Sequence, residues 1–390
     1  MNVTIDVSYK SLNKHNEELC GDKVEILKTK DSNIIILADG MGSGVKANIL
    51  ATLTSKILGT MFLNGAKLEE CVQTIVKTLP VCKVRQVAYS TFSILQIFHN
   101  GEAYLVEFDN PACVFIRDKK LHNIPYNERI IEGKKIREYR FQVKMNDCFI
   151  LMSDGVIHAG VGKALNFGWT WDNMAKYSVD ATNATLSASR LVSILSKACD
   201  DLYMHSPGDD TTIAVARVTD SKVVHLFTGP PLDKQDDEKA VKAFLSGSAT
   251  RIISGGTSAN IVSRITGHPI NTSLNYTDMD LPPIASIEGI DLVTEGVLTL
   301  TRTLQLLKHY VDGAIDEHFF LELDKDNGGS LIAKKIIESC TELHMFVGRT
   351  INEAHQNPNL PFDLSIRMNL VTQIAEAVKK MGKTVFITYF

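Results

Sequence analysis

The chain has 390 residues, of which 44% are hydrophobic and 22% are charged, and its net charge at pH 7 is −4. This composition is typical of a globular protein with two or three domains, excludes wholesale disorder, and offers no basic surface for nucleic acid. No apolar run approaches the roughly 20 residues that span a bilayer, and the first residues lack the features of a secretory signal. Seven scattered cysteines without a CxxC pair favour reduced thiols, so we expect a cytoplasmic protein.

The first half of the chain alternates clusters of strands with pairs of helices, which favours an α+β fold with mostly antiparallel sheets. Alternating apolar and polar residues predict a strand at residues 3–9, and a continuous apolar run at 33–38 predicts a buried central strand. Further strands are expected at residues 90–98, 103–108, 113–117, 140–144, 148–152 and 211–218. Apolar residues at helical spacing predict helices at 45–62, 68–79 and 186–198.

The composition of the sequence changes near residue 220, where a short apolar strand is followed by a polar stretch. We therefore expect one domain at residues 1–219 and a separate α/β domain at 220–390. The second domain is expected to be a regulatory or ligand-binding module. Its predicted helices lie at residues 240–245, 297–311 and 366–381, and its predicted strands include 223–227 and 384–390.

Four sites in the first half place aspartate beside glycine, most of them next to a strand-like run. Glycine permits a tight turn, which can hold the carboxylate at the open edge of a rigid sheet. Converging carboxylates repel one another unless a cation neutralises them, and oxygen ligands without His or Cys select Mg²⁺ or Mn²⁺ over zinc. Two such ions form the usual clamp for phosphoester hydrolysis. The aspartates are Asp22, Asp39, Asp154, Asp209 and Asp210.

The segments LCGDKVE, LADGMGSGVKA, LMSDGVIHAG and GDDTTIAV resemble, in this order, the metal-dependent protein phosphatase (PPM) superfamily. They are most like its bacterial branch, the stage II sporulation protein E-like serine phosphatases, and the resemblance covers about residues 1–218. It implies an αββα sandwich that carries two Mn²⁺ or Mg²⁺ ions at a sheet edge.

The resemblance also implies roles for single residues. Asp39 would bridge both metal ions, and Gly40 would offer its backbone carbonyl. In GDDTT the family ligand aligns best with Asp209, with Asp210 beside it. The implied metal-binding set is Asp22, Asp39, Gly40, Asp154, Asp209 and Asp210, and the implied catalytic set is Asp39, Asp154 and Asp209.

The implied activity is that of a cytoplasmic bacterial protein serine/threonine phosphatase, in which water activated by two metal ions attacks a phosphoserine or phosphothreonine. The substrate would be a phosphorylated regulatory protein, for which an anti-sigma-factor antagonist is the suggested candidate. No nucleic acid and no membrane are implied, a small ligand or protein at the second domain is left open, and so is a homodimer. Two alternatives stay open: a signalling protein whose C-terminal domain senses a ligand or partner, and a small-molecule phosphatase.

The sequence departs from the pattern of the eukaryotic branch of the superfamily in two ways. Met41 stands where the eukaryotic branch has a histidine, and the first 84 residues contain no arginine that would bind phosphate. Protonation of the leaving group by a side chain is therefore not predicted. The glycines after Asp39 also suggest a dinucleotide loop, but their GxGxG spacing and the helical pattern near residue 60 do not fit that motif.

Three features outside these motifs allow two interpretations. Residues 251–260, RIISGGTSAN, are either an anion-binding loop or an ordinary turn in which Thr257 or Ser258 caps the next helix, and the turn is favoured. For Trp169 and Trp171, core packing is favoured over a mobile flap. A solvated surface is favoured over a second metal site for Glu288, Asp291 and Glu295.

Overall fold

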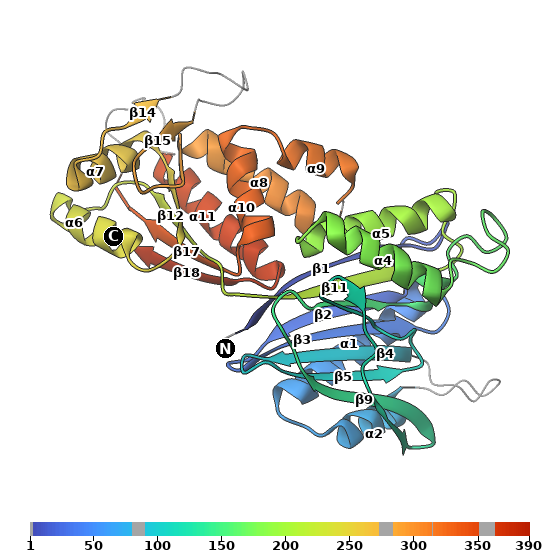
Figure 1. The fold of residues 1–390 in the computed structure, drawn as a ribbon. Helices are drawn as coiled ribbons and strands as arrows, with labels where there is room; N and C mark the ends of the chain where they lie inside the picture. The colour runs from blue at the N-terminus through green and yellow to red at the C-terminus, as the bar shows by residue number, and fades with distance from the viewer. Residues whose placement is uncertain (1–2, 80–89, 273–283, 314, 351–362) are drawn as a thin grey trace. The chain divides into compact units, whose positions relative to one another are not determined.

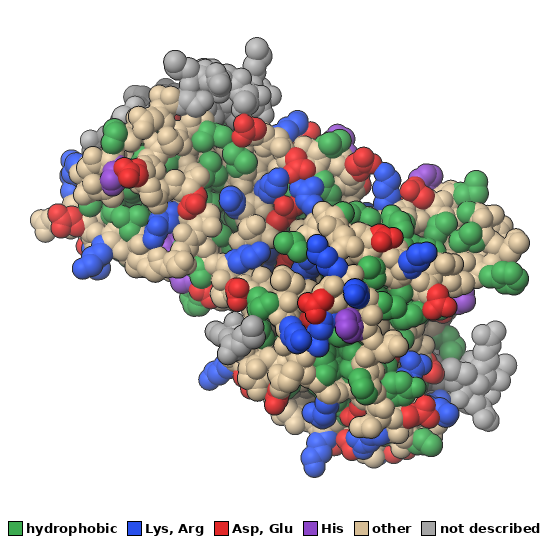
Figure 2. Space-filling view, viewed as in Figure 1, with side chains coloured by type: hydrophobic (Ala, Val, Ile, Leu, Met, Phe, Trp, Pro, Cys, Tyr) green, Lys and Arg blue, Asp and Glu red, His purple; other side chains and the backbone are tan. Residues whose placement is uncertain are grey.

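The computed structural model describes residues 3–79, 90–272, 284–313, 315–350 and 363–390 (Figure 1). The chain divides into two compact units, which meet in sequence between Asp220 and Ser221. Among the described residues, no helix is both long enough and apolar enough to cross a membrane. On the face shown in Figure 2, basic and acidic side chains are interspersed over the surface of each unit.

The N-terminal unit contains two antiparallel sheets. The first has the order β1-β11-β10-β6-β7, and the second has the order β2-β3-β4-β5-β9-β8. The strands of the first sheet are β1 (Thr4–Leu12), β11 (Thr211–Thr219), β10 (Cys148–Met152), β6 (Val114–Arg117) and β7 (Lys120–Leu121). Those of the second are β2 (Asp22–Lys28), β3 (Ser32–Gly40), β4 (Ser90–Phe98), β5 (Glu102–Phe108), β9 (Lys134–Gln142) and β8 (Asn127–Ile131).

Helices cover the outer face of each sheet. Helices α1 (Gly44–Leu63) and α2 (Leu68–Thr78) accompany the six-stranded sheet, whereas α4 (Trp171–Ala184) and α5 (Ala188–Leu202) accompany the five-stranded sheet (Figure 1). The inner faces of the two sheets share one hydrophobic core, which includes Leu37, Leu95, Phe149 and Ala214. The unit is therefore an αββα sandwich, which confirms the expected fold class.

Strand β3 and helix α1 pack together because β3 is a continuous apolar run and α1 carries small residues on one face. Ile34, Ile35, Ile36 and Leu37 are buried on both faces of β3 because the strand lies between the helix layer and the inner core. Burial of one such side chain contributes about 1.5–3 kcal/mol. Helix α1 turns its small residues toward β3, including Ala47 and Ala51, so that helix and sheet approach closely.

The C-terminal unit is a mixed sheet with helices on both faces, in the order β14-β15-β16-β13-β12-β17-β18. The last five strands in this order are parallel to one another. The strands are β12 (Val223–Thr228), β13 (Thr250–Ser254), β14 (Asn271–Thr272), β15 (Ala285–Ser286), β16 (Leu292–Thr294), β17 (Glu342–Val347) and β18 (Thr384–Tyr389). The helices are α6 (Asp237–Leu245), α7 (Gly256–Thr266), α8 (Val297–Val311), α9 (Glu317–Leu323), α10 (Gly328–Ser339) and α11 (Asp363–Lys380), after a 3₁₀ turn at Lys234–Asp236.

Several elements were not predicted, and charge explains the omissions in the six-stranded sheet. Strands β2 and β8 and the first half of β9 carry many Lys, Arg, Asp and Glu residues, which obscure the apolar alternation of a strand. Helix α4 begins at Trp171 in a stretch that the sequence assigned to no element. The packing prediction for Trp169 is confirmed, because its ring is buried and lies edge-on to Tyr177.

Candidate metal centre

Two of the predicted aspartates face each other across neighbouring strands. Asp22 begins β2, Asp39 is the next-to-last residue of β3, and the antiparallel register pairs the two directly. The backbone N–H of Gly40 donates to the carbonyl of Gly21 at 3.1 Å, which joins the two strand ends. Directly opposed side chains in an antiparallel pair lie on the same face, with Cβ atoms about 4.5–5.5 Å apart. The register therefore brings both carboxylates to one edge of the six-stranded sheet.

The other three aspartates come from the five-stranded sheet. Asp154 begins the short helix α3 (Asp154–Ile157) just after β10, and Asp209 and Asp210 lie just before β11. The Ser153 N–H donates to the Thr212 carbonyl at 3.0 Å, and the Ser153 hydroxyl accepts from the Thr212 N–H at 2.9 Å. These bonds hold the end of β10 beside the start of β11, so the three aspartates share one edge of their sheet.

A close approach at Gly21 joins the two groups. A Cβ atom at Gly21 would lie 2.7 Å from Oδ2 of Asp210, so the Asp210 carboxylate lies against the residue that precedes Asp22. The backbone N–H of Lys14 donates to Oδ1 of Asp210 at 3.0 Å. Both carboxylate oxygens of Asp22 and Oδ2 of Asp210 are buried and accept no hydrogen bond from any described residue. Buried oxygens of this kind are costly unless a cation or a proton neutralises them.

Burial and mutual repulsion raise the pKa values of the cluster. The pKa of Asp39 is raised to about 9, mainly by burial and next by the negative charges of Asp22 and Asp154. Burial likewise raises the pKa of Asp22 to about 7, although the nearby hydroxyls of Ser153 and Thr212 oppose the shift. The pKa of Asp209 is raised by burial and by the charge of Asp154. The cluster therefore favours binding of protons or other cations at neutral pH.

The chemistry of this cluster fits a hard divalent cation. Its side-chain donors are carboxylate oxygens, which Mg²⁺ and Mn²⁺ prefer, and three of these oxygens have no hydrogen-bond donor among the described residues. In the described part of the chain, no three Asp, Glu, His or Cys side chains are close enough to hold a metal ion as they stand. Metal binding would thus require the carboxylates to turn toward a common point.

The two adjacent aspartates before β11 occupy different environments. Asp210 is 4% exposed and its Oδ1 holds the Lys14 backbone, whereas the Asp209 side chain is 46% exposed. The Lys14 ammonium lies 3.9 Å from Oδ1 of Asp209. Asp154 is also exposed. Asp154 and Asp209 thus form the accessible part of the cluster, and Asp22 and Asp210 form its buried part.

Two glycines allow the backbone to close around the cluster. A Cβ atom at Gly40 would lie 2.1 Å from the carbonyl oxygen of Ala47, in the first turn of α1. A Cβ atom at Gly155 would lie 2.1 Å from the carbonyl oxygen of Asp210. Any other residue at either position would displace backbone, so these two glycines of the DG motifs position the aspartates.

Sequence reasoning missed the side chains that support the cluster. The Asn48 side chain on α1 donates to the carbonyl of Cys20 at 2.7 Å, and the Ser43 hydroxyl donates to Oε1 of Glu17 at 2.9 Å. Both bonds tie the segment before β2 to the start of α1. No sequence pattern marks Glu17 or Asn48, because neither lies at the end of a strand-like run.

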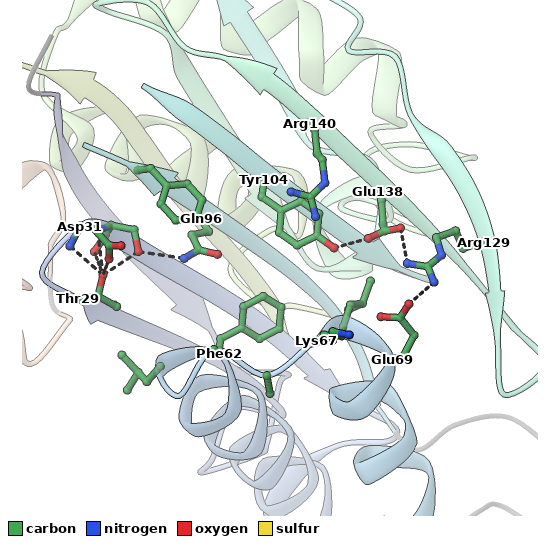
Figure 3. A pocket seen from close by; sticks show the side chains of 16 residues that line it. Thr29, Asp31, Phe62, Lys67, Glu69, Gln96, Tyr104, Arg129, Glu138 and Arg140 are labelled. Atoms are coloured by element: carbon green, nitrogen blue, oxygen red, sulfur yellow. Dashed lines mark hydrogen bonds and ion pairs between the residues drawn. The ribbon is translucent and has the colours of Figure 1, made fainter. Parts of the chain in front are cut away.

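A separate cavity of about 600 Å³ lies between the α1–α2 connection and the face of the six-stranded sheet (Figure 3). It reaches Ser32, which lies seven residues before Asp39 on β3 and thus about 23 Å away along the strand. In this cavity Arg129 pairs with both Glu69 and Glu138, and Arg140 stacks on the ring of Tyr104 at 4.1 Å. The cavity is therefore distinct from the aspartate cluster.

Residues 29–219 match the family model of stage II sporulation protein E (SpoIIE). A search of curated protein sequences found no significant match. Among solved structures, one similar fold is the PP2C phosphatase domain with a regulatory fragment of SpoIIE from Bacillus subtilis, with 18% identity and a TM-score of 0.48. That match covers 56% of this chain and 64% of the other, so the chain spans less than two thirds of that protein's length.

Two further structures show a similar likeness. The RsbU and RsbW domains of a Mycobacterium tuberculosis protein share 17% identity with a TM-score of 0.47, over 62% of this chain and 68% of theirs. RsbX in complex with magnesium shares 19% identity with a TM-score of 0.39, over 55% of this chain and 96% of its own. The family match confirms the resemblance found in the sequence.

Proposed function

Because residues 29–219 belong to the stage II sporulation protein E family, we propose that the N-terminal unit is a metal-dependent protein serine/threonine phosphatase. The observation that supports this proposal is that Asp210 of one sheet lies against Gly21, beside the Asp22–Asp39 pair of the other sheet. The charges of Asp154, Asp209 and Asp210 all act on Asp39. Three buried carboxylate oxygens in this group have no donor among the described residues. A cation between the sheets would neutralise them.

Asp39, Asp154 and Asp209 are the residues that we propose to hold the ions directly. Asp22, Asp210 and the Gly40 carbonyl would complete the set. Two Mn²⁺ or Mg²⁺ ions, when bound, would supply positive charge for the phosphoryl oxygens and lower the pKa of water toward neutrality. Asp154 and Asp209 are the accessible carboxylates, so the phosphoryl group of a substrate would approach from their side.

The serine side chains beside the aspartates hold loops in place and do not have the partners of a covalent nucleophile. The Ser43 hydroxyl donates to Glu17, and the Ser153 hydroxyl accepts from the backbone of Thr212. Both hydroxyls are thus occupied in holding loops, and neither has a histidine or lysine partner among these bonds. A nucleophile from water is therefore favoured over a serine nucleophile.

The proposed substrate is phosphoserine or phosphothreonine on a bacterial regulatory protein in the cytoplasm. An anti-sigma-factor antagonist is the specific candidate that follows from the family. The carboxylates act on the phosphoryl group and not on its carrier, so the protein part of the substrate is a separate claim that needs its own test.

The test is hydrolysis by the full-length protein after EDTA treatment and dialysis, with Mn²⁺ or Mg²⁺ added back. Three substrates separate the claims: a phosphoserine peptide, free phosphoserine and p-nitrophenyl phosphate. We expect metal-dependent release of phosphate and a higher kcat/KM for the peptide than for free phosphoserine. Equal values for the two would favour a small-molecule phosphatase, and no metal-dependent release from any substrate would contradict the proposal.

A further inference from the structure

The C-terminal unit brings two glycine-containing strand ends to the same edge of its parallel sheet. Strands β13 and β16 are parallel neighbours, and their last residues, Ser254 and Thr294, are partners in the register. Gly255 follows the first strand and Gly296 follows the second by two residues, and a helix begins directly after each. In open α/β sheets, ligands bind outside the carboxyl ends of the parallel strands.

The starts of the two helices touch each other at these glycines. A Cβ atom on Gly296 would lie 3.6 Å from the Cα of Gly255, and one on Gly255 would lie 4.0 Å from the Cα of Gly296. Gly255 has a φ of +125°, a conformation that L side chains rarely adopt. Neither helix has a side-chain cap. Two positive helix ends therefore lie side by side at this point.

The N–H groups at this point precede the helical hydrogen-bond ladders. The first helical bond of α7 runs from Ala259 N–H to the Gly255 carbonyl, and that of α8 runs from Leu300 N–H to the Gly296 carbonyl. The N–H groups of residues 256, 258 and 297–299 therefore lie before the first bond of their helices. They are the donors that an anion at this point would meet.

A buried hydroxyl independently indicates a ligand here. Ser258, in the first turn of α7, is fully buried, and its Oγ has no hydrogen-bond partner among the described residues. This Oγ would lie 3.7 Å from a Cβ on Gly255, so it is directed back toward the meeting point of the helices. The sequence predicted that Thr257 or Ser258 caps α7, and this was wrong: Gly255 is the N-cap residue.

One acidic side chain borders the meeting point. Both carboxylate oxygens of Glu295 would lie 3.8 Å from a Cβ on Gly256. This carboxylate repels a bare phosphate ion, but it can accept a hydrogen bond from a hydroxyl beside the phosphate group. Glu295 is exposed, so its carboxylate is available to a ligand that binds beside Gly256. The predicted solvated position of Glu295 is thus confirmed.

We propose that this corner, formed by Gly255, Gly256, Ser258, Glu295 and Gly296, binds a phosphorylated sugar. The phosphate group would accept from the N–H groups of the two helix starts and from the Ser258 hydroxyl. A sugar hydroxyl would donate to Glu295. The C-terminal unit is thereby a small-molecule binding module.

The test is calorimetric titration of the full-length protein with ribose 5-phosphate, inorganic phosphate and ribose. EDTA is present throughout, so phosphate does not bind through metal ions in the N-terminal unit and hydrolysis plays no part. Failure here would leave the phosphatase proposal standing, and failure of phosphatase activity would leave this one standing.

We expect saturable binding of ribose 5-phosphate that is tighter than binding of inorganic phosphate or ribose. Ser258→Ala should weaken it about tenfold, which corresponds to about 1.4 kcal/mol. Glu295→Gln should reduce the preference for ribose 5-phosphate over inorganic phosphate. The matched control is Ser263→Ala, because Ser263 lies on the same helix but its hydroxyl donates to His268 at the other end; this variant should bind like wild type.

A second variant, Gly296→Ala, tests the same site if Ser258→Ala changes the affinity only slightly. Gly296→Ala would place a methyl group between the helix starts, and it should also weaken binding. Because the ψ of Gly296 is −103°, which residues with a side chain rarely adopt, the unfolding midpoint of this variant is measured alongside. The proposal is overturned if wild type shows no saturable binding at millimolar ligand. It is also overturned if Ser258→Ala and Gly296→Ala bind as well as Ser263→Ala, or if inorganic phosphate binds as tightly as ribose 5-phosphate.

Discussion

Asp22 at the start of β2 lies directly opposite Asp39 near the end of β3. This register sets two like charges side by side at the edge of a sheet, where like-charged cross-strand pairs are destabilising. In the metal-free chain a proton relieves this repulsion, since the pKa of Asp39 is about 9; a bound cation would relieve it with both carboxylates ionised. The pair is therefore a place where either a proton or a metal ion would stabilise the folded chain.

Gly155→Ala should destabilise the N-terminal unit. The added methyl group would meet the Asp210 carbonyl at 2.1 Å and the Thr211 hydroxyl at 2.6 Å, so the chain before β11 must shift. Overpacking of this kind typically costs about 1–3 kcal/mol. Thermal unfolding followed by tryptophan fluorescence is a suitable measurement, because both tryptophans, Trp169 and Trp171, lie in this unit.

The matched control for this glycine is Gly208→Ala in the neighbouring motif. A Cβ atom there would meet the Tyr203 ring at 3.5 Å, which is an ordinary contact. Gly208→Ala should therefore unfold close to the wild-type temperature. Equal midpoints for the two variants would show that the backbone contact at Gly155 is not as tight as described.

The stability of the metal-free protein should fall as the pH rises from 5 to 8. The pKa of Asp39 is about 9 and that of Asp22 about 7 in the folded chain, whereas an unfolded aspartate has a pKa of about 3.9. The folded state thus binds more protons in this interval, and the free energy of unfolding decreases as these protons are lost. The measurement is the unfolding midpoint in EDTA at several pH values.

Two comparisons isolate the aspartate cluster from other titrating groups. Asp39→Asn should show a smaller fall between pH 5 and 8, because an amide does not ionise. Mn²⁺ should flatten the profile of the wild type, since the cation replaces the protons. Parallel pH profiles for wild type and Asp39→Asn would refute this electrostatic account.

Arg117→Met should strongly destabilise the same unit. Arg117 donates to Asp147 through Nε at 2.9 Å and through Nη2 at 2.6 Å, and the Asp147 side chain is only 1% exposed. Loss of one partner leaves a buried charge, which costs about 3–5 kcal/mol. Chemical denaturation with tryptophan fluorescence gives the free energy of unfolding.

An exposed ion pair provides the control for Arg117. Lys135 pairs with Glu128 at 3.3 Å, and their side chains are 73% and 46% exposed. Lys135→Met should change the free energy of unfolding by less than about 1 kcal/mol. A loss at Arg117 no larger than the loss at Lys135 would mean that the Asp147 carboxylate is not confined as the structure indicates.

Much of the N-terminal fold was predictable from local patterns. The strand at Cys148–Met152 and the helix at Gly44–Leu63 agree closely with prediction, because apolar residues dominate one and follow helical spacing in the other. The pairing of Asp22 with Asp39 was not predictable, because register depends on the whole hairpin. The order of the motifs identified the aspartates. Their burial and the approach of Asp210 to Gly21 depend on tertiary structure and could not be predicted.

The C-terminal unit shows the limit of local reasoning. Its α/β character follows from alternating apolar runs and helical segments, but the parallel order of β16, β13 and β12 involves contacts between distant segments. The cap of α7 was predicted incorrectly because hydroxyl residues are common caps. The structure places Gly255 there instead, where its positive φ suits the close approach of Gly296.

The most direct test of the central claim is Mn²⁺-dependent hydrolysis of a phosphoserine peptide by wild type, Asp39→Asn, Asp154→Asn and the control Asp31→Asn. Asp31 is exposed at the opposite end of the β2–β3 hairpin, where it accepts a hydrogen bond from the Thr29 hydroxyl at 2.6 Å. We predict that the first two variants lose about 100-fold or more in kcat, while Asp31→Asn keeps wild-type activity. Full Mn²⁺-dependent activity in Asp39→Asn and Asp154→Asn would contradict the proposed metal centre.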